Sequence, residues 1–476
     1  MAKVAILTMS DGRDFAYQDV LDYCRDHEAT LAEELRRQGH TVLLAGQIVG
    51  DSQTAVAGAR LLAGQRPDLT VFHYPVWAFP HFSLLAAGAT DGPLLLFSNM
   101  HPRYPGMVGL LAAGGGLDQV GRRHARLCGD LGDPEVAAKL GVHIRAGAAV
   151  RALSGSTFGR IGGRPMGMYT AVSSSADWIR IFGVDVEEID QWEVVRRAAA
   201  VSPERARAGR EWIERLAARV AYDGRSLTPE LLERQIRMYH AIRELVAEWH
   251  LDFCGIKGQP ELTNHFATTD VAEAFLNDPY DWEGPKAPFV CATESDMDGA
   301  LTMQILRLLT GQPVLFADVR HYHADRGLWD LCNSGQHPTW YAARSDDPAV
   351  NLARVQFLPE SFYFPAGGAS VRHIAAPGEM TFARLSRLGE RYRLQVTRGR
   401  LAPLEDADAE RLAAQSSPEW PHAFAQLDAP AAGFLQRFGA NHIHAVPGDH
   451  TAELEVAAGL LGIPVDRLDG GPEGSA

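Results

Sequence analysis

The stretch PFVCATESDMDGALTMQILRLLTGQPVLFAD (residues 288–318) decides the expected fold of the chain. Phe289–Thr293 is an apolar run typical of a buried strand, and Ser295 or Asp296 can cap a helix that starts there. Apolar residues then recur at helical spacing, a glycine can end the helix, and Val314–Ala317 forms a second apolar run. A crossover this short predicts neighbouring or near-neighbouring parallel strands of one sheet.

Two acidic side chains directly follow the predicted strands, Glu294 after the first and Asp318 after the second. Because adjacent strands lie about 4.8 Å apart, we expect both carboxylates at one carboxyl edge of the sheet. Such a pair repels unless one carboxyl is protonated or a cation lies between them, and oxygen ligands favour Mg²⁺ or Mn²⁺ over zinc. The alternative is two solvated loop acids, or a Glu294 that only caps the following helix.

A third ligand must come from elsewhere, and the chain has 18 histidines to offer. Two groups stand out: His321 and His323 just beyond Asp318, and His442 and His444 in a predicted strand that ends at a turn. Alternate residues of a strand share one face, so His442 and His444 would point the same way. Spacing alone does not choose between them.

Working outward, the first 150 residues alternate short apolar strands with helical patterns, which predicts a doubly wound α/β layer with a parallel sheet. The expected strands there are residues 4–8, 41–45, 69–73 and 93–97. From about residue 350 the pattern favours an antiparallel barrel or sheet, with β-rich runs at 361–365, 370–374, 380–388 and 392–401.

Composition excludes several classes of function. The chain has 476 residues, 46% hydrophobic and 22% charged, with a net charge of −14, so neither nucleic acid nor an anionic membrane is expected as a partner. No apolar run approaches the ~20 residues of a membrane span, and the N-terminus lacks signal-peptide anatomy. The five cysteines are far apart without a C-x-x-C pair, which argues against a disulfide framework or a thiolate zinc site and favours the cytoplasm.

Several blocks of the sequence resemble the L-fucose isomerase family, within the wider group of L-fucose and L-arabinose aldose–ketose isomerases. The blocks are ATESDMDGALTMQILRLLTG (292–311), VLFADVR (314–320), NSG (333–335), GANHIHAVPGD (439–449) and LLGIPV (460–465). Weaker matches, among them Asp11-Gly12-Arg13 and Pro75-Val76-Trp77, extend the resemblance over most of the chain. The chain is shorter than the typical member.

The resemblance implies two doubly wound α/β domains, residues 1–150 and 151–325, followed by a β-rich, barrel-like C-terminal domain, residues 326–476. It implies a Mn²⁺ site, with Mg²⁺ or Co²⁺ as alternatives, held by Glu294, Asp318 and His442 rather than His444. It also implies a homo-oligomer, hexamer or trimer, with active sites between subunits. Arg13 and Trp77 match positions that reach into a neighbour's site.

Sugar binding needs planar hydrogen-bonding groups beside an aromatic or apolar wall. Candidates are Gln259, Asn441 and Trp420, the last in the stiff segment Pro-Glu-Trp-Pro. The alternative for each tryptophan is ordinary packing. Lys257 could contact a substrate that carries an anionic group, or it could point outward.

The function expected from these residues is metal-dependent interconversion of an aldose and a ketose. A divalent cation would stabilise the enediolate, with Glu294 and Asp318 as the proton-transferring pair. The same ligands could serve a metal-assisted hydrolase, and the α/β layers could belong to a non-catalytic sugar-binding protein. The first alternative needs a separate general base that the sequence does not offer, and the second leaves the paired carboxylates unexplained.

Overall fold

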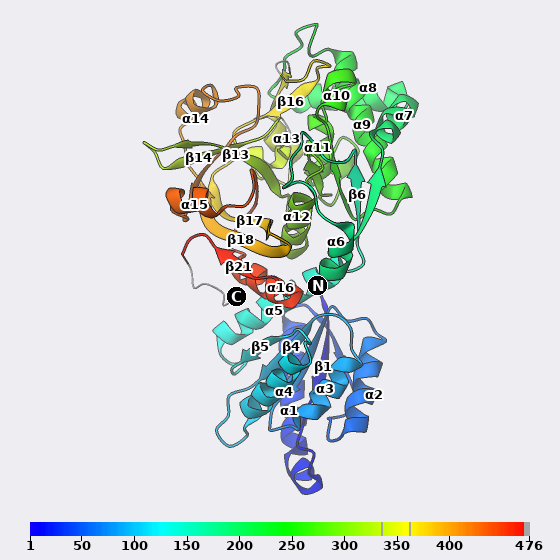
Figure 1. Cartoon of the computed structure of the whole chain (residues 1–476), viewed down its shortest axis with the longest axis vertical. Helices are drawn as coiled ribbons and strands as arrows, with labels where there is room; N and C mark the ends of the chain where they lie inside the picture. Colours follow the sequence, from blue (N-terminus) through cyan, green and yellow to red (C-terminus); the bar gives the residue numbers. More distant parts are fainter. Residues whose placement is uncertain (335–336, 361–362, 471–476) are drawn as a thin grey trace. The chain divides into compact units, whose positions relative to one another are not determined.

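The computed structural model describes residues 1–334, 337–360 and 363–470, and these divide into two compact units. The first unit is Met1–Ser154 together with Ala452–Ile463, and the second is Gly155–Thr451 together with the residues from Pro464 onward (Figure 1). Every helix in the described chain falls short of the length or the apolar content that a membrane span requires.

A five-stranded parallel sheet in the order β2-β1-β3-β4-β5 organises the first unit. Alternate residues of β1 bury on opposite faces: Ala5 and Leu7 pack under α2, α3 and α4, whereas Val4 and Ile6 pack under α1 and α5. The predicted doubly wound layer is therefore confirmed. Its elements are β1 (Lys3–Thr8), α1 (Asp14–Arg37), β2 (Thr41–Leu44), α2 (Ser52–Ala63), β3 (Leu69–Tyr74), α3 (Pro80–Gly88), β4 (Leu94–Ser98), α4 (Gly106–Gln119), β5 (Ala125–Cys128) and α5 (Pro134–Leu153).

A segment from near the C-terminus completes this unit. It lies within α16 (Thr451–Leu461), where Glu453 forms a 2.7 Å ion pair with Arg145, and the Leu461 carbonyl accepts a hydrogen bond from Arg123.

The second unit begins with a four-stranded parallel sheet in the order β12-β9-β6-β7. Its helices and strands up to the predicted crossover are β6 (Thr157–Ile161), α6 (Ser175–Phe182), β7 (Asp185–Ile189), α7 (Gln191–Ala200), α8 (Pro203–Leu216), β8 (Arg219–Val220), α9 (Pro229–Glu248), β9 (Phe253–Ile256), α10 (Glu261–His265), α11 (Asp270–Asn277), β10 (Tyr280–Asp281), β11 (Gly284–Pro285), β12 (Cys291–Thr293) and α12 (Met297–Thr310).

A β-barrel follows in the same unit. Its strands pair in the order β17-β20-β13-β14-β19-β18, the pairing of β17 with β18 closes the ring, and β21 adds to β18. The remaining elements are β13 (Leu315–His323), β14 (Leu328–Cys332), a 3₁₀ turn (Thr339–Ala342), α13 (Pro348–Leu352), β15 (Gln356–Pro359), β16 (Ala369–Arg372), β17 (Gly378–Leu388), β18 (Arg391–Leu401), α14 (Asp406–Ala413), β19 (Ala423–Leu427), α15 (Ala431–Arg437), β20 (His442–Pro447) and β21 (Val465–Arg467).

The barrel confirms the β-rich C-terminal region. The predicted runs at 370–374, 380–388 and 392–401 match β16, β17 and β18, whereas 361–362 lie outside the described residues and 363–365 form no strand. Residues such as Leu315, Ala317 and Ile443 fill the barrel core. Because side chains alternate along a strand, Asp318 and His442 lie on its outer face.

One topological prediction is wrong. The strands on either side of α12 are not parallel neighbours, because β12 belongs to the parallel sheet whereas β13 pairs antiparallel with β14 and β20 in the barrel. Strand, helix and strand follow as predicted, with Asp296 as the cap and Gly311, at φ 70°, ending the helix. The local pattern does not specify which sheet the second strand joins. In the structure the nine-residue β13 joins the barrel, where β14 and β20 pair with it.

Helix α12 lies between the four-stranded parallel sheet and the barrel (Figure 1). It packs against β9 and β12 of the parallel sheet and against β17 and β20 of the barrel. The turn after β12 with Glu294, the middle of β13 with Asp318 and the start of β20 with His442 are thereby held around the first turn of α12. Asp318 was predicted to follow its strand, but β13 continues past it to His323.

Candidate active site

Glu294 lies in the turn that joins β12 to α12. Glu294 and Ser295 both have left-handed backbone φ angles, 58° and 51°, which non-glycine residues rarely adopt. The turn is buried, and the Asp296 carboxylate ends it by accepting a hydrogen bond of 2.9 Å from the Gly299 amide. Left-handed residues that persist in buried turns cluster at functional sites, because the surrounding structure has to hold them.

Asp318 and His442 lie next to each other on the outer face of the barrel. They are directly opposed in the antiparallel register of β13 and β20, so their side chains leave the sheet on the same side. The His442 Nε2 atom lies 2.9 Å from a Glu294 oxygen and 3.5 Å from an Asp318 oxygen. The structure therefore brings together the three side chains chosen from the sequence, although their strands belong to different sheets.

The second ring nitrogen of His442 has a fixed partner. Nδ1 lies 2.7 Å from a carboxylate oxygen of Asp296, which also pairs with the buried guanidinium of Arg384. His444, on the same face of β20, lies beside Arg384, with 3.2 Å between its Nε2 and Nη1 of the arginine. Of these two histidines, only His442 faces the carboxylates.

Electrostatics at His442 indicate a place for a cation. Burial by itself would lower the pKa of His442, but the carboxylates of Asp296 and Glu294 outweigh it and raise the pKa to about 10. Nε2 is buried and makes no hydrogen bond within the described chain, despite the oxygens around it. With its pKa near 10 the ring is protonated when no metal is bound, and a divalent cation would take the place of the Nε2 proton. Nε2 would then face the cation beside two carboxylates, with Nδ1 oriented by a third, a donor set that suits a divalent cation.

Asp318 is held by two amides. Asn441 donates a hydrogen bond to one of its oxygens and Asn333 to the other, each at 3.2 Å. Burial raises the pKa of Asp318, and the nearby His442 opposes that rise.

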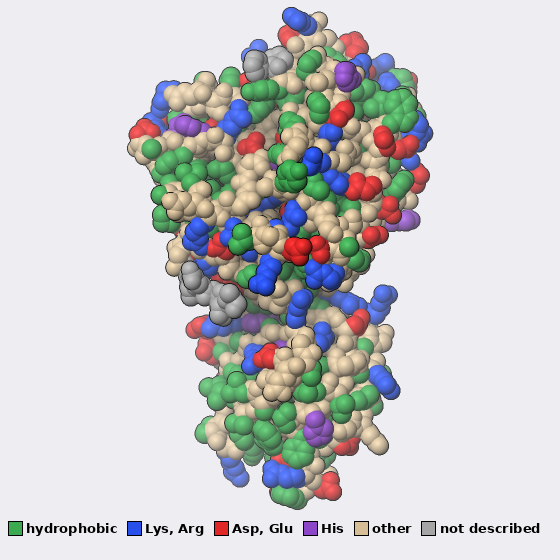
Figure 2. Space-filling view, viewed as in Figure 1, with side chains coloured by type: hydrophobic (Ala, Val, Ile, Leu, Met, Phe, Trp, Pro, Cys, Tyr) green, Lys and Arg blue, Asp and Glu red, His purple; other side chains and the backbone are tan. Residues whose placement is uncertain are grey.

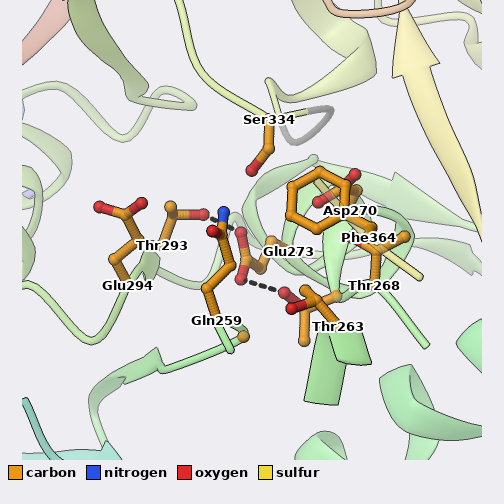
Figure 3. Close-up of a pocket in the computed structure, with 11 residues that line it drawn as sticks. Gln259, Thr263, Thr268, Asp270, Glu273, Thr293, Glu294, Ser334 and Phe364 are labelled. Carbon is orange, nitrogen blue, oxygen red and sulfur yellow. Dashed lines mark hydrogen bonds between the residues drawn. The ribbon is translucent and has the colours of Figure 1, made fainter. Parts of the chain in front are cut away.

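A small cavity lies beside Glu294. Figure 3 shows Gln259 and Ser334 approaching it from opposite sides, with the Glu294 carboxylate at one edge and Glu273 beside Thr293. Burial raises the pKa of Glu273 well above its usual range, and its carboxyl is held by the hydroxyls of Thr269, at 2.7 Å, and Thr293. The lining is Gly258, Gln259, Thr263, Thr268, Thr269, Asp270, Glu273, Thr293, Glu294, Ser334 and Phe364.

The other candidates for sugar binding in this unit differ in position. Gln259 lines the cavity and Asn441 contacts Asp318. Trp420 is buried in a cluster with Phe364, and the Arg320 guanidinium lies 5.2 Å from its ring centre. The Lys257 ammonium is paired at 2.7 Å with Glu261, so its charge is already balanced.

Arg13 and Trp77 belong to the first unit, where they follow β1 and β3. These strands are neighbours at the point where the strand order reverses, the usual ligand-binding crevice of doubly wound sheets. Asp11 holds the Arg13 guanidinium at 2.5 Å, while the arginine side chain stays 54% exposed.

Sequence reasoning missed several neighbours of the site. Asp296 was expected only as a possible helix cap, and nothing local signalled its contact with His442. Asn333, Ser334 and Glu273 were not singled out as site residues, although the first two lie in the NSG block.

A second group of metal-binding residue types was also missed. Ligand atoms of Asp330, Cys332 and His422, all buried, lie within 4.8 Å of one another. Asp330 and Cys332 share a strand face by their spacing, which the sequence could have shown, but nothing local connects them to His422. All five cysteines of the chain are free thiols.

Three family models match the chain. They describe the first N-terminal domain of L-fucose isomerase over residues 1–155, its second N-terminal domain over residues 239–311, and its C-terminal domain over residues 331–469. Together these matches span most of the chain, and the third contains His442.

Similar proteins agree with the family models. The L-fucose isomerase of Haemophilus influenzae is 25% identical over 97% of this chain and 92% of its own length. The L-fucose isomerase of Klebsiella pneumoniae is 24% identical over 98% of this chain and 92% of its own length. That of Streptococcus pneumoniae is 26% identical over 89% and 84% of the two lengths.

Proposed function

The chain belongs to the L-fucose isomerase family, and we propose that it is a metal-dependent isomerase that interconverts an aldose and a ketose of the L-fucose or arabinose type by enediol proton transfer. The observation that carries the proposal is the buried, unbonded Nε2 of His442, 2.9 Å and 3.5 Å from the carboxylates of Glu294 and Asp318.

In this proposal Glu294, Asp318 and His442 hold the cation, Mn²⁺ in the first place, with Mg²⁺ or Co²⁺ as alternatives. When bound, the cation supplies Lewis acidity to two adjacent sugar oxygens. Asp296 keeps the His442 ring oriented through Nδ1, and the two asparagine amides keep the Asp318 carboxylate in place.

The reaction moves one proton between neighbouring carbons and another between their oxygens. We assign this work to Glu294 and Asp318, since positioned carboxylates contribute about 10²–10⁴-fold in rate as acid or base.

Substrate contacts are proposed for Gln259, Asn441 and Trp420. Because Glu261 already balances the charge of Lys257, a neutral sugar suits this part of the site better than an anionic one. Gln259 is the best placed of the group, since it lines the same cavity as Glu294.

A homo-oligomer completes the proposal, with Arg13 and Trp77 of one subunit serving the site of another. The first unit exposes an apolar surface on α3 and α4: Leu85, Met107, Val108 and Leu111 are 40–52% exposed. Figure 2 shows hydrophobic side chains gathered over that unit. A surface of this kind supports burial against another copy.

The proposal is tested with metal-stripped protein, a panel of aldoses and D₂O, with and without Mn²⁺. Isomerase activity predicts metal-dependent ketose formation with deuterium entering at C2. Glu294→Gln should lower turnover at least about 10³-fold while thermal stability is kept, and Glu390→Gln, an exposed residue of the β17–β18 turn, should leave turnover unchanged. Sugar binding without deuterium exchange under any metal would indicate a binding protein. Metal-dependent bond hydrolysis would indicate a hydrolase. Either result contradicts the proposal.

A further inference from the structure

A row of polar side chains crosses the outer face of the barrel. Asp318 of β13 is directly opposite His442 on one side and Cys332 of β14 on the other. Leu331 pairs with Ala423, so His422, one residue earlier, continues the row beside Cys332. Opposed residues of antiparallel strands share a face, which places two clusters of metal-binding residue types next to each other on one surface.

The second cluster is Asp330, Cys332 and His422. All three are 0% exposed, and one ligand atom from each lies within 4.8 Å of the other two. One oxygen of Asp330 lies 2.8 Å from Nδ1 of His422, while the other, Oδ2, is buried and makes no hydrogen bond within the described chain. A buried carboxylate oxygen without a partner is costly, and it points to a missing ligand.

The His422 ring is oriented as a metal ligand would be. Its Nε2 lies 2.9 Å from the Ser417 carbonyl oxygen, which can only accept a hydrogen bond, so Nε2 carries a proton. Nδ1, the other nitrogen, faces the carboxylate. Metal-bound histidines usually donate their second N–H to a backbone carbonyl or a carboxylate, which fixes the ring as it is fixed here.

We propose that Asp330, Cys332 and His422 form a second metal site, selective for zinc, that is distinct from the site of Glu294, Asp318 and His442. A thiolate, an imidazole and a carboxylate are the three ligand types of zinc, whereas Mn²⁺ and Mg²⁺ prefer oxygen. The thiolate forms when Cys332 gives up its thiol proton, so that proton leaves as Zn²⁺ enters. The site uses a single thiolate, which is why cysteine spacing gave no sign of it.

The place of this site suggests its task. Cys332 ends β14 and is followed by Asn333, which donates to Asp318, and His422 follows the segment that carries Trp420. An ion held by Asp330, Cys332 and His422 would tie the end of β14 to the start of β19, and so hold the loops on either side of the proposed sugar site. We assign it a structural role, and this role stands whether or not the isomerase proposal does.

Cobalt substitution tests the site without any activity assay. Metal-stripped full-length protein is titrated with Co²⁺, and the ultraviolet charge-transfer band of a cobalt–thiolate bond is followed. We expect the band in the wild-type protein and in His442→Gln, and its loss in Cys332→Ser. Cys128→Ser, which removes a thiol of the first unit, is the matched control and should keep the band.

A second measurement covers the case in which Cys332→Ser fails to fold. Asp330→Asn keeps the shape of the side chain and its contact with His422, and we expect zinc affinity to fall at least about tenfold. Metal analysis should find two ions per wild-type chain after loading with Zn²⁺ and Mn²⁺, and one in Asp330→Asn. The proposal is overturned if wild-type protein gives no thiolate band, if His442→Gln also abolishes it, or if Asp330→Asn binds zinc as tightly as the wild type.

Discussion

Asp296 makes three contacts in the buried turn after β12. Its carboxylate caps α12 through the Gly299 amide, pairs with the Arg384 guanidinium, and lies 2.7 Å from Nδ1 of His442. The guanidinium and the ring hold the pKa of Asp296 far below its usual range even though burial opposes this. The ionised Asp296 side chain therefore determines where α12 starts and how the His442 ring is oriented.

Asp296→Asn is expected to weaken Mn²⁺ binding about 10–100-fold, because an amide no longer holds the His442 ring as a carboxylate does. Stability should fall as well, by about 3 kcal/mol, since Arg384 loses its buried counter-charge. Calorimetric titration with Mn²⁺ and thermal unfolding measure the two effects.

The matched control is Asp51→Asn, which changes a helix cap of the first unit where Asp51 accepts from the Thr54 amide at 2.8 Å. Asparagine caps helices as well as aspartate does, so this variant should change little. Equal Mn²⁺ affinity in Asp296→Asn and wild type would contradict the role of Asp296.

Ionisation of the Asp270 carboxyl makes the free energy of unfolding depend on pH. Burial raises its pKa to about 7, against about 3.9 in an unfolded chain. Between about pH 4 and pH 7 the folded protein keeps this proton and the unfolded chain does not, so stability falls as pH rises through that window. Asp270→Asn, which stays neutral, should be more stable than wild type at pH 8, by about 4 kcal/mol for a pKa difference of about three units, and equally stable near pH 4.

Urea unfolding at the two pH values checks this expectation. The control is Asp346→Asn, the same substitution at an exposed side chain. A stability gain of Asp270→Asn that is the same at pH 4 and pH 8 would show that ionisation of Asp270 is not its cause.

Helix α12 depends on a glycine in its first turn. A Cβ atom at Gly299 would lie 2.6 Å from an Asp296 oxygen and 2.7 Å from an Arg384 nitrogen. Both distances are too short, so the two side chains would have to move and their ion pair would be disturbed. The helix is buried between two sheets, so it has no room to shift away. The position has to be glycine for the sake of the Asp296–Arg384 contact.

Gly299→Ala is therefore expected to destabilise the protein by about 1–3 kcal/mol and to lower turnover at least about tenfold, despite the better helix propensity of alanine. Gly433→Ala in α15 is the control, since nothing lies within 4 Å of a Cβ there, and it should be neutral or stabilise by up to about 1 kcal/mol. Thermal unfolding and steady-state kinetics of both variants decide the matter, and identical behaviour would contradict the steric argument.

The proposed assembly makes a prediction about mixed subunits. If Arg13 of one copy serves the Glu294 site of another, Arg13→Ala and Glu294→Gln proteins are each inactive alone but form some intact sites when mixed. We expect activity to return after subunit exchange, measured as ketose formation against mixing ratio.

Mixing Glu294→Gln with Asp318→Asn is the control. Both changes affect the same set of residues in one unit, so no mixture can restore an intact site. If mixed oligomers form, as native mass spectrometry would show, and the Arg13→Ala mixture stays inactive, the shared-site proposal is wrong.

The sequence was most informative about elements whose signals are local. Four of the five strands of the first unit, the capped start of α12 and its Gly311 terminus are expected from the sequence, because apolar alternation, capping and left-handed glycines act within a few residues; β5 is not. The resemblance added the choice of His442 over His444, which spacing left open. The three-domain division and the roles of the site residues stay predictions.

Local pattern could not say which sheet β13 joins, or that Asp330 and Cys332 meet His422. These outcomes depend on pairing between strands about 90 to 130 residues apart, where register and packing against α12 decide. The sequence by itself determined the elements and the residue types at their ends. Only the tertiary structure decided that Glu294 from a parallel sheet meets Asp318 and His442 on the outside of a barrel, because long-range contacts are selected by the packing of the whole core and not by any one segment.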